Sequence, residues 1–305
     1  MFLREGRGEK NNIVVIGGCG KVGQNLIFNI SAIVSFPVTY FARDFSQASR
    51  ISACIQDCLT NNVSVSLDKK VLHDADVIIF ICGRSTDSGS NKDSLYEINK
   101  GLIQDYIQFF TGKDIILVSN PCTQLGAYIE QETHCYVYGV GVQNDFCRAH
   151  YQNDAVSYVI GAHNIFEQCH YNTSDYIFFD GFVEHAGYQL TRLKQNRYLE
   201  RNFDYLLYCD LNRIEQLKWW KIQRFHSLKN SLAMSCAKSI VDILLYLMGE
   251  KSSVHAEVRL VLNHSIDVFI GLPIIAGEIG CPHSTINEFL NKNEVYLEKY
   301  KIEKN

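Results

Sequence analysis

Short runs of consecutive apolar residues recur through the first 142 positions, and they constrain the fold more than any other feature of the chain. Such runs are typical of strands that are covered on both faces, as the strands of parallel sheets are. The strand candidates are IVVI (Ile13–Ile16), PVTYFA (Pro37–Ala42), DVIIFIC (Asp76–Cys82), DIILVS (Asp114–Ser119) and YVYGVGV (Tyr136–Val142).

Segments with helical spacing separate these runs. One covers 22–33 and another covers 93–112, where Asp93 or Ser94 can cap the start and Gly112 can end the helix. Strands that alternate with helices predict a parallel sheet with right-handed crossovers, so the expected fold class is α/β with a Rossmann-type doubly wound sheet. Ligands of such sheets bind outside the carboxyl ends of the strands. The apolar positions expected to face the sheet are Leu26, Ile27, Ile30 and Ile33, then Leu95, Ile98, Leu102, Tyr106 and Phe109.

The second half of the chain has a different pattern. VHAEVRLVL (Val254–Leu262) alternates with a period of two, which predicts a half-exposed antiparallel strand, and DVFIGLPIIAG follows it. Amphipathic stretches come before it at 198–223 and 231–248, and a charged helix closes the chain. We therefore predict two domains, 1–142 and a mixed α+β domain over 143–305, a division that suits 305 residues.

Composition and charge exclude several classes of protein. A net charge of −4 and a pI of about 6.2 do not suit a polyanion-binding surface, so nucleic acid is not an expected partner. No apolar run reaches the roughly 18–20 residues that cross a bilayer, so no membrane association is expected, and the charged start MFLREGRGEKNN does not resemble a secretory signal. The 11 cysteines are scattered without CxxC or paired Cys/His spacing, so we expect no metal site, no disulfide framework and a cytoplasmic location.

The segment IVVIGGCGKVGQNL joins the first strand candidate to the first helix candidate, and its glycines have the spacing of a dinucleotide-binding loop. Gly18 would allow the tight turn, Gly20 would let a pyrophosphate approach the backbone, and Gly23 would let the helix pack close to the sheet. The first amides and the dipole of that helix would favour the phosphate charge. The alternative is a glycine corner that binds nothing. The strand–turn–helix context favours a dinucleotide-binding domain over 1–142.

The end of the second strand bears on the choice between NAD and NADP. An NAD site has an acidic residue about 20 residues after the glycines, where it binds the ribose hydroxyls. Here the sequence is TYFARDF, and the position falls on Ala42 or Arg43. An arginine without a carboxylate suits the 2′-phosphate of NADP, which gives NADP a slight preference. In the alternative, Asp44 binds the ribose and Arg43 points to solvent.

A third segment, GVGVQNDFCRAHYQNDAVSYVIGAHN, holds the residue types that hydride transfer on 2-hydroxy acids requires. Asp145 and Arg148 are three positions apart and share one face of a helix, and His163 follows at the end of an apolar stretch. An imidazole can exchange the hydroxyl proton, a carboxylate can orient the imidazole and stabilise its charged form, and an arginine fork can bind the substrate carboxylate.

The chain resembles the lactate/malate dehydrogenases, whose motifs recur in order from about Asn12 to Asn291. GGCGKVG is similar to the glycine loop of that family, FICGRSTDSGSNKDSL to its strand and mobile loop, and VSNP to its asparagine–proline turn beside the nicotinamide. NDFCR is similar to its LDxxR motif, GAHN to its GEHGD motif, and DVFIGLPIIAGEIG to its FLGVPVxLGxxG strand pair.

The resemblance implies an NAD(P)-dependent oxidoreductase that transfers hydride between nicotinamide and a 2-hydroxy/2-oxo acid, or a related imino acid, and that assembles as a homodimer or homotetramer. It implies that 143–305 is the substrate/catalytic domain. The implied catalytic residues are His163 and Asp145, the implied substrate contacts are Arg148, Lys92, Asn120 and Thr86, and the implied cofactor contacts are Gly18, Gly20, Lys21, Val22, Gly23, Arg43, Gly83 and Asn120.

Several positions depart from the family pattern. Lys92 stands where the family has its carbonyl-polarising arginine, and lysine keeps the charge without the planar fork. The side-chain selector of the mobile loop falls on Thr86, beside Asp87, and neither suits a second carboxylate, so malate and oxaloacetate are not expected substrates. Ala162 and Asn164–Ile165 flank the histidine where the family has Glu and Gly-Asp. These changes predict a remodelled pocket around a retained catalytic trio.

A different hypothesis is a non-catalytic descendant of that family that persists as a nucleotide-binding or scaffold module. The altered loop and the missing cofactor acid favour this hypothesis. The joint presence of His163, Asp145 and Arg148 favours the enzyme, because stability alone gives no reason to keep the three together.

Overall fold

The computed structural model describes residues 12–84, 92–152, 158–162, 165–170, 173–180, 229–262, 266–293, 298 and 300–302. The predicted amphipathic stretch at 198–223 lies outside the described residues, as do Thr86 and His163. Lys92 and Arg148 are described by their helical backbone.

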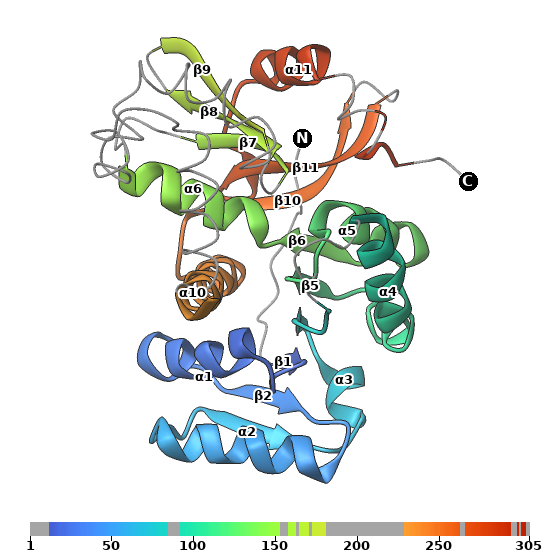
Figure 1. Ribbon diagram of the computed structural model, residues 1–305, viewed down its shortest axis with the longest axis vertical. Helices are drawn as coiled ribbons and strands as arrows, with labels where there is room; N and C mark the ends of the chain where they lie inside the picture. The colour runs from blue at the N-terminus through green and yellow to red at the C-terminus, as the bar shows by residue number, and fades with distance from the viewer. Residues whose placement is uncertain are drawn as a thin grey trace, which may run out of the picture.

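Parallel strands of the first half form one side of a continuous sheet (Figure 1). They are β1 (Ile13–Ile16), β2 (Val38–Phe41), β3 (Val63–Ser66), β4 (Val77–Phe80), β5 (Asp114–Leu117) and β6 (Tyr136–Gly139). Their order is β3-β2-β1-β4-β5-β6, and every neighbouring pair is parallel. This is the doubly wound, Rossmann-type order, so the predicted fold class is confirmed. The sequence VSVS of β3 lacks a continuous apolar run, which is why this strand was not predicted.

Helices connect these strands and cover both faces of the sheet. They are α1 (Lys21–Ile33), α2 (Phe45–Asp57), α3 (Lys70–Asp74), α4 (Lys92–Gln104), the 3-10 turn η1 (Ile107–Phe109) and α5 (Cys122–Glu132). The first predicted helix is present, although its last apolar residue, Ile33, is 49% exposed. The remaining apolar residues of its stripe, Leu26, Ile27 and Ile30, are buried.

Helix α4 differs from its prediction in both its ends and its buried face. It begins at Lys92 instead of after a cap at Asp93 or Ser94, and it ends at Gln104. Its inner face contains Asn99 and Ile103, which are fully buried, whereas Ile98 is 43% exposed. A buried polar residue on the inner face explains the error, because an apolar count places the stripe on the neighbouring positions.

Strand β6 is shorter than the predicted run Tyr136–Val142. It ends at Gly139, and helix α6 (Gly141–Gln152) begins two residues later. Val140 and Val142 are buried all the same. A buried first turn of a helix needs the same apolar residues as the end of a buried strand, so a short run does not distinguish them.

Antiparallel strands extend the sheet through the second half of the chain. They are β7 (Tyr158–Ala162), β8 (Ile165–His170), β9 (Thr173–Asp180), β10 (Ser253–Leu262), β11 (Ile266–Ile275) and β12 (Glu278–Ile279), with helices α10 (Lys229–Leu247) and α11 (His283–Lys292). The predicted antiparallel strand is β10, which pairs with β11 along ten positions, from Ser253↔Ile275 to Leu262↔Ile266. Strand β10 meets the parallel strands at one pair, Glu257↔Gly139.

The prediction that β10 is half exposed is wrong. Its burial pattern is almost continuous, and the polar residues His255 and Glu257 are 6% and 0% exposed. The His255 ring stacks on Phe146 of α6 with ring centroids 3.8 Å apart, and the Glu257 carboxylate accepts a hydrogen bond from Thr123 Oγ1 of α5 at 2.6 Å. Because polar residues bury themselves with partners here, alternation in polarity does not indicate alternation in exposure.

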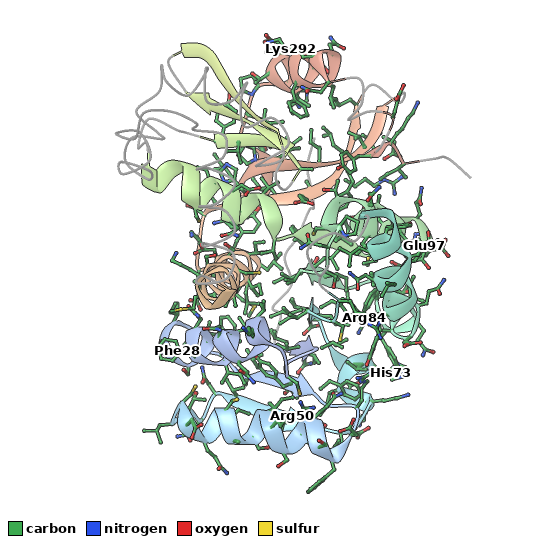
Figure 2. The ribbon with its side chains drawn as sticks, viewed as in Figure 1. Phe28, Arg50, His73, Arg84, Glu97 and Lys292 are labelled. Atoms are coloured by element: carbon green, nitrogen blue, oxygen red, sulfur yellow. The ribbon has the colours of Figure 1, made fainter. Side chains whose placement is uncertain are left out.

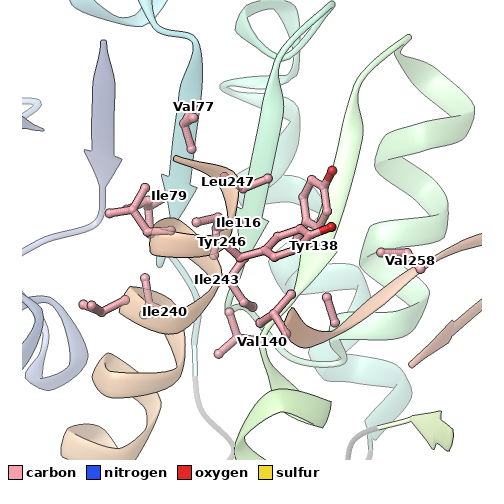
Figure 3. Packing of buried hydrophobic residues seen from close by; sticks show 14 of the residues in the cluster. Val77, Ile79, Ile116, Tyr138, Val140, Ile240, Ile243, Tyr246, Leu247 and Val258 are labelled. Atoms are coloured by element: carbon pink, nitrogen blue, oxygen red, sulfur yellow. The ribbon is translucent and has the colours of Figure 1, made fainter. Parts of the chain in front are cut away.

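Alternate strand residues point to opposite faces of the parallel sheet, and each face has its own core. On one face, α10 of the second half packs against strands of the first half (Figure 3). The residues of this contact include Val77, Ile79, Ile116 and Tyr138 from the strands and Ile240, Ile243, Tyr246 and Leu247 from α10. In Figure 1, α10 lies between α1 and α6. The division of the chain at 142/143 stays a prediction, because this core contains residues from both sides of it.

Within the ranges described above, no helix is both long enough and apolar enough to span a membrane. The same ranges contain no group of three or more histidine, cysteine, aspartate or glutamate side chains placed to bind a metal ion.

Candidate functional site

The glycine segment after β1 forms the turn that leads into α1. The left-handed residue of this turn is Gly17, with φ of +97°. A Cβ atom on Gly17 would lie 2.6 Å from the Cys82 backbone nitrogen, one on Gly18 would overlap the Tyr40 ring, and one on Gly23 would overlap the Gly18 carbonyl. Contacts within the protein therefore require glycine at each of these three positions.

Gly20 differs from the other glycines of the segment. A Cβ atom there would have no neighbour within 4 Å. Gly20 is the N-cap of α1, with φ of −81°, so neither backbone strain nor packing requires glycine at this position. Lys21 and Val22 follow in the first turn of the helix, which has no acidic residue. The helix N-terminus with open space at Gly20 is the arrangement that lets an anion reach backbone amides.

The end of β2 places a cation near this loop. Ala42 is buried and Arg43 is exposed. The Gln47 amide lies beside Arg43: its oxygen accepts from the Arg43 backbone nitrogen at 3.3 Å or, with the amide turned over, from Nε at 3.2 Å and from Nη2 at 2.9 Å. Asp44 caps α2, because its side chain accepts from the Gln47 backbone nitrogen at 2.8 Å. This bond counts against the alternative in which Asp44 binds the ribose.

The charge of Arg43 influences the pKa of two nearby thiols, those of Cys82 and Cys19. Burial raises the pKa of the Cys82 thiol to about 11, and the nearby Arg43 guanidinium opposes this rise. Burial also raises the pKa of the Cys19 thiol, where Arg50 and Arg43 again act in the opposite direction. Both thiols are therefore protonated at neutral pH. Arg43 therefore lies near both the glycine loop, which contains Cys19, and the end of β4, which Cys82 follows.

The carboxyl ends of β4 and β5 are held together by side chains. Asn99 of α4 is fully buried and makes three hydrogen bonds: Oδ1 accepts from the Arg84 backbone nitrogen at 2.7 Å, and Nδ2 donates to the carbonyls of Arg84 at 3.2 Å and Asn120 at 2.6 Å. Ser119 Oγ donates to the Cys82 carbonyl. Arg84 lies beside α4 at this edge (Figure 2).

These bonds bring together two of the predicted site residues. Gly83 and Asn120 are both exposed at the carboxyl ends of neighbouring strands, and a Cβ atom on Gly83 would lie 3.4 Å from Ser119 Oγ. The peptide bond between Asn120 and Pro121 is cis. Asn99, which fixes this edge, was missed from the sequence. A polar residue on the inner face of an otherwise apolar helix is the signal that could have found it.

Helix α6 supplies the predicted acidic residue of the site. Asp145 is 4% exposed, and the preceding Gln143 is 2% exposed. The Gln143 side chain joins α6 to two other elements: Nε2 donates to Asp242 Oδ2 of α10 at 3.2 Å, and Oε1 accepts from the His255 backbone nitrogen of β10 at 2.7 Å. Lys251 Nζ lies 2.7 Å from the other Asp242 oxygen. Gln143, also missed from the sequence, therefore fixes the position of the helix that holds Asp145.

Helix α6 and strand β7 meet at one point of β11. Gly271 of β11 pairs with Gly161 of β7. A Cβ atom on Gly271 would overlap Val142 of α6 and would lie 2.5 Å from the Gly161 carbonyl oxygen. The strand that leads to His163 therefore runs beside the first turn of the helix that contains Asp145 and Arg148. The convergence of these three side chains stays a prediction, since His163 and the Arg148 side chain lie outside the described parts.

No family model matches the sequence, and no curated protein matches it either. Solved structures match its fold along nearly its whole length. The malate dehydrogenase of Archaeoglobus fulgidus in complex with NADH has a TM-score of 0.65 at 16% identity and covers 94% of this chain and 97% of its own. The malate dehydrogenase of Cryptosporidium parvum has a TM-score of 0.62 at 15% identity, with 95% and 98% covered.

A third solved structure is the lactate dehydrogenase of Cryptosporidium parvum complexed with lactic acid and nicotinamide adenine dinucleotide. Its TM-score is 0.60 at 16% identity, and 95% of this chain and 98% of that chain are covered. The chain therefore has the fold of the lactate and malate dehydrogenases, as the order of motifs predicted. At these identities the likeness shows the fold, and the activity has to be argued from the site.

Proposed function

We propose that the chain is an NAD(P)-dependent oxidoreductase of the lactate/malate dehydrogenase type, acting on a 2-hydroxy/2-oxo acid or a related imino acid with an altered substrate pocket. The observation that supports it most is the open space at Gly20. Contacts within the protein require the other glycines of the loop, whereas the space beside Gly20 is open, as a ligand that approaches the backbone there would need.

The residues of this edge fit a dinucleotide. Its pyrophosphate would lie at the N-terminus of α1, against Gly20, Lys21 and Val22, where amides and the helix dipole favour negative charge. Its nicotinamide would lie at the carboxyl ends of β4 and β5, beside Gly83 and Asn120. When bound, the nicotinamide ring would supply or accept the hydride.

The choice of cofactor depends on Arg43. Two of the solved structures named above, the Archaeoglobus fulgidus malate dehydrogenase and the Cryptosporidium parvum lactate dehydrogenase, contain NADH or NAD, which argues for NAD by analogy. Arg43 argues for NADP, because it offers a guanidinium to a 2′-phosphate, and because the neighbouring carboxylate of Asp44 already caps α2. We propose that NADPH binds at least as well as NADH.

The substrate side would work through three groups. His163 would give the substrate oxygen its proton or remove it, Asp145 would orient the imidazole and stabilise its charged form, and Arg148 would bind the substrate carboxylate in two parallel bonds. The burial of Asp145 in α6, and the meeting of α6 with β7 at Gly271, support this arrangement. Lys92 would face the reacting oxygen, and Thr86 the substrate side chain.

The substrate side chain is the point at which this proposal departs most from the family pattern. With Thr86 and Asp87 at the selector, a second carboxylate would meet no cation and one negative charge. We therefore propose a 2-oxo or imino acid with a neutral or positively charged side chain.

The resemblance also supports a homodimer or homotetramer, and a monomer in sedimentation at micromolar concentration would contradict that part of the proposal.

The second candidate is a non-catalytic nucleotide-binding or scaffold protein, which Lys92 favours because it lacks the planar fork of arginine. A depletion assay separates the two candidates. The protein is mixed with NADH or NADPH and a panel of 2-oxo acids, with and without ammonium, and cofactor absorbance is followed. Turnover of any member supports the enzyme. Tight cofactor binding without turnover on the whole panel supports the scaffold.

A further inference from the structure

Two neighbouring amides of α6 differ in how their hydrogen bonds are satisfied. The Gln143 amide donates to Asp242 and accepts from the His255 backbone. The Asn144 side chain is also buried, with 7% of its surface exposed, but its Oδ1 atom has no hydrogen-bond partner in the part of the chain that the structure describes. One amide therefore holds the helix in place, and the other has an acceptor that no described residue satisfies.

The position of Asn144 on the helix associates it with the proposed catalytic residues. Successive residues of an α-helix are rotated by about 100°, so Asn144, Arg148 and Asp145 fall within one wedge of about 100°. Arg148 lies between the other two in this projection, four residues after Asn144 and three after Asp145. Asn144 thus lies on the side of α6 where Arg148 would bind the substrate carboxylate and Asp145 would orient the catalytic histidine.

The resembling motif does not require an amide at this place. The LDxxR motif that NDFCR resembles has leucine here, so an apolar side chain suits the same position in that fold. A buried acceptor that has lost water without gaining a donor destabilises the protein. An unsatisfied polar group in a native fold needs a specific explanation, such as a catalytic role, an ordered water or an ion, and departures of this kind are expected at functional or strained sites.

We propose that Asn144 is a specificity-determining residue whose Oδ1 accepts a hydrogen bond from a donor on the bound ligand. This inference rests on the proposed function. A carbonyl oxygen of an amide can only accept, so the ligand group must be a hydroxyl, ammonium or amide N–H. Two sources fit this chemistry: the side chain of the substrate, or the carboxamide of the nicotinamide.

The same acceptor selects against some substrates. A carboxylate in the substrate side chain has no proton to donate and would bring a second negative oxygen to Oδ1. An apolar side chain would leave the acceptor buried and unsatisfied, and sites built to bind a hydroxyl reject analogues that lack it. The substrate class that fits is therefore a 2-oxo acid, or its imine, with a hydroxyl, amide or amino group near the reacting carbon.

The test uses the full chain with Asn144→Leu, which installs the residue of the resembling motif. Gln143→Leu is the matched control, because it removes a neighbouring amide that is already bonded within the protein. Asn144→Leu should leave the melting temperature equal or higher, since it removes an unsatisfied acceptor, whereas Gln143→Leu should lower it. A lower melting temperature for Asn144→Leu would show that Oδ1 bonds within the protein, and would overturn the proposal.

Two ligand measurements distinguish the sources. The first compares 3-hydroxypyruvate with 2-oxobutanoate, which have similar size because the first has a hydroxyl where the second has a methyl group. The comparison uses kcat/KM or the shift of the melting temperature in the presence of cofactor. The second compares NADH with its acetylpyridine analogue, which lacks the carboxamide donor. If the substrate is the donor, Asn144→Leu should reduce the preference for 3-hydroxypyruvate about 10-fold and leave the second comparison unchanged. If nicotinamide is the donor, NADH alone should lose about 10-fold in affinity.

The remaining outcomes overturn one proposal or both. A wild-type protein that binds cofactor and substrates, with both comparisons unchanged in Asn144→Leu, overturns the role of Asn144 and leaves the proposed function intact. A wild-type protein that binds neither NADH nor NADPH overturns the proposed function, and the role of Asn144 falls with it. A protein that binds cofactor without turnover still tests Asn144 through the melting-temperature shifts.

Discussion

The two sides of the candidate site are built in different ways. On the nucleotide side, the turn after β1 is shaped by missing side chains, because Cβ atoms on Gly17, Gly18 and Gly23 would overlap or crowd their neighbours. On the substrate side, α6 is held by side chains that are present. Gln143 and Asp242 bond to each other in the interior, and the Asn144 acceptor beside them has no partner among the described residues.

The difference determines what each side can do. A turn made of backbone presents amides at fixed positions and suits the phosphate backbone that all dinucleotides share. A helix held by buried hydrogen bonds presents chosen side chains, and each can be exchanged without changing the fold. Under the proposed function, the nucleotide side would therefore set the class of cofactor, and the substrate side would set which substrate is turned over.

The largest expected effect tests whether the two sides are separable. His163→Asn should lower kcat by roughly 10²–10⁴, because it removes a positioned acid–base group. The affinities for NADH and NADPH, measured by fluorescence titration, should stay within about 2-fold, since the histidine acts on substrate. An unchanged kcat would remove His163 from the mechanism. An equal loss of cofactor affinity would show that the two sides are one unit.

The second effect separates glycines that shape the protein from the one proposed to face a ligand. Gly18→Ala should lower the free energy of unfolding by roughly 1–3 kcal/mol, because the new methyl group overlaps the Tyr40 ring. Gly20→Ala should change it by less than about 1 kcal/mol. It should nevertheless weaken both cofactors about 10-fold or more, the loss expected for one hydrogen bond to a charged group.

Urea unfolding and cofactor titration of the same two variants check this contrast. If Gly20→Ala leaves both affinities unchanged, the loop is a glycine corner without a ligand. If Gly20→Ala lowers the free energy of unfolding as much as Gly18→Ala does, a side chain at position 20 would clash with the protein, contrary to the open space around Gly20.

The same contrast explains which parts of the fold could be predicted from the sequence. Continuous apolar runs such as Ile13–Ile16 mark strands buried on both faces, and the glycine spacing marks the turn, because these are local consequences of backbone geometry. The end of β6 could not be predicted, since Val140 and Val142 are buried equally well by a helix. Strand β10 was misjudged because His255 and Glu257 are buried with partners from other elements.

The candidate site divides along the same line. Gly20, Arg43 and Asn120 follow strand ends, so their positions could be predicted once the strands were known. The partners of Gln143 lie 99 and 112 positions away in the sequence, and no spacing rule connects them. Asn99 similarly bonds to Arg84 and Asn120 across 15 and 21 positions. Side-chain networks of this kind depend on the finished fold, and a single sequence does not reveal them.

The third effect concerns the edge of the nucleotide side. Arg43→Ala should weaken NADPH about 10-fold, the value of roughly one charge-assisted hydrogen bond to the 2′-phosphate. NADH should change by less than about 2-fold, because its ribose offers no such charge. Equal weakening of both cofactors would show that Arg43 does not contact the phosphate.

Asp44→Ala serves as the control for this prediction. Removing the α2 cap should lower the free energy of unfolding by about 1 kcal/mol, with no preference between cofactors. A selective loss of NADH in Asp44→Ala would instead support the alternative in which this carboxylate binds the ribose, despite its bond to the Gln47 backbone.

The smallest effect is a pH dependence at the contact between α5 and the antiparallel strands β10 and β11. Glu130 at the end of α5 accepts a hydrogen bond from the Val137 backbone nitrogen at 2.8 Å. Burial raises its pKa from the ordinary 4.5 to about 7, the Val137 bond and the charge of Arg259 on β10 oppose the rise, and Asp267 on β11 adds to it. Arg259 binds Asp267 through two bonds, of 2.9 and 2.6 Å, so much of its charge is already compensated.

A carboxyl whose pKa is higher in the folded protein than in the unfolded chain holds its proton longer when folded. Its contribution to stability is complete below about pH 4.5 and is lost as the pH rises through about 7. One unit of pKa shift corresponds to about 1.4 kcal/mol, and solvent around the partly exposed side chain reduces the total to on the order of 1 kcal/mol.

Glu130→Gln keeps the acceptor for Val137 and removes the titration. Wild type should therefore lose stability relative to Glu130→Gln between about pH 5 and pH 8 in urea unfolding. Parallel stability curves for the two proteins would mean that the carboxyl has an ordinary pKa, and that the join between α5 and the antiparallel strands is open to water.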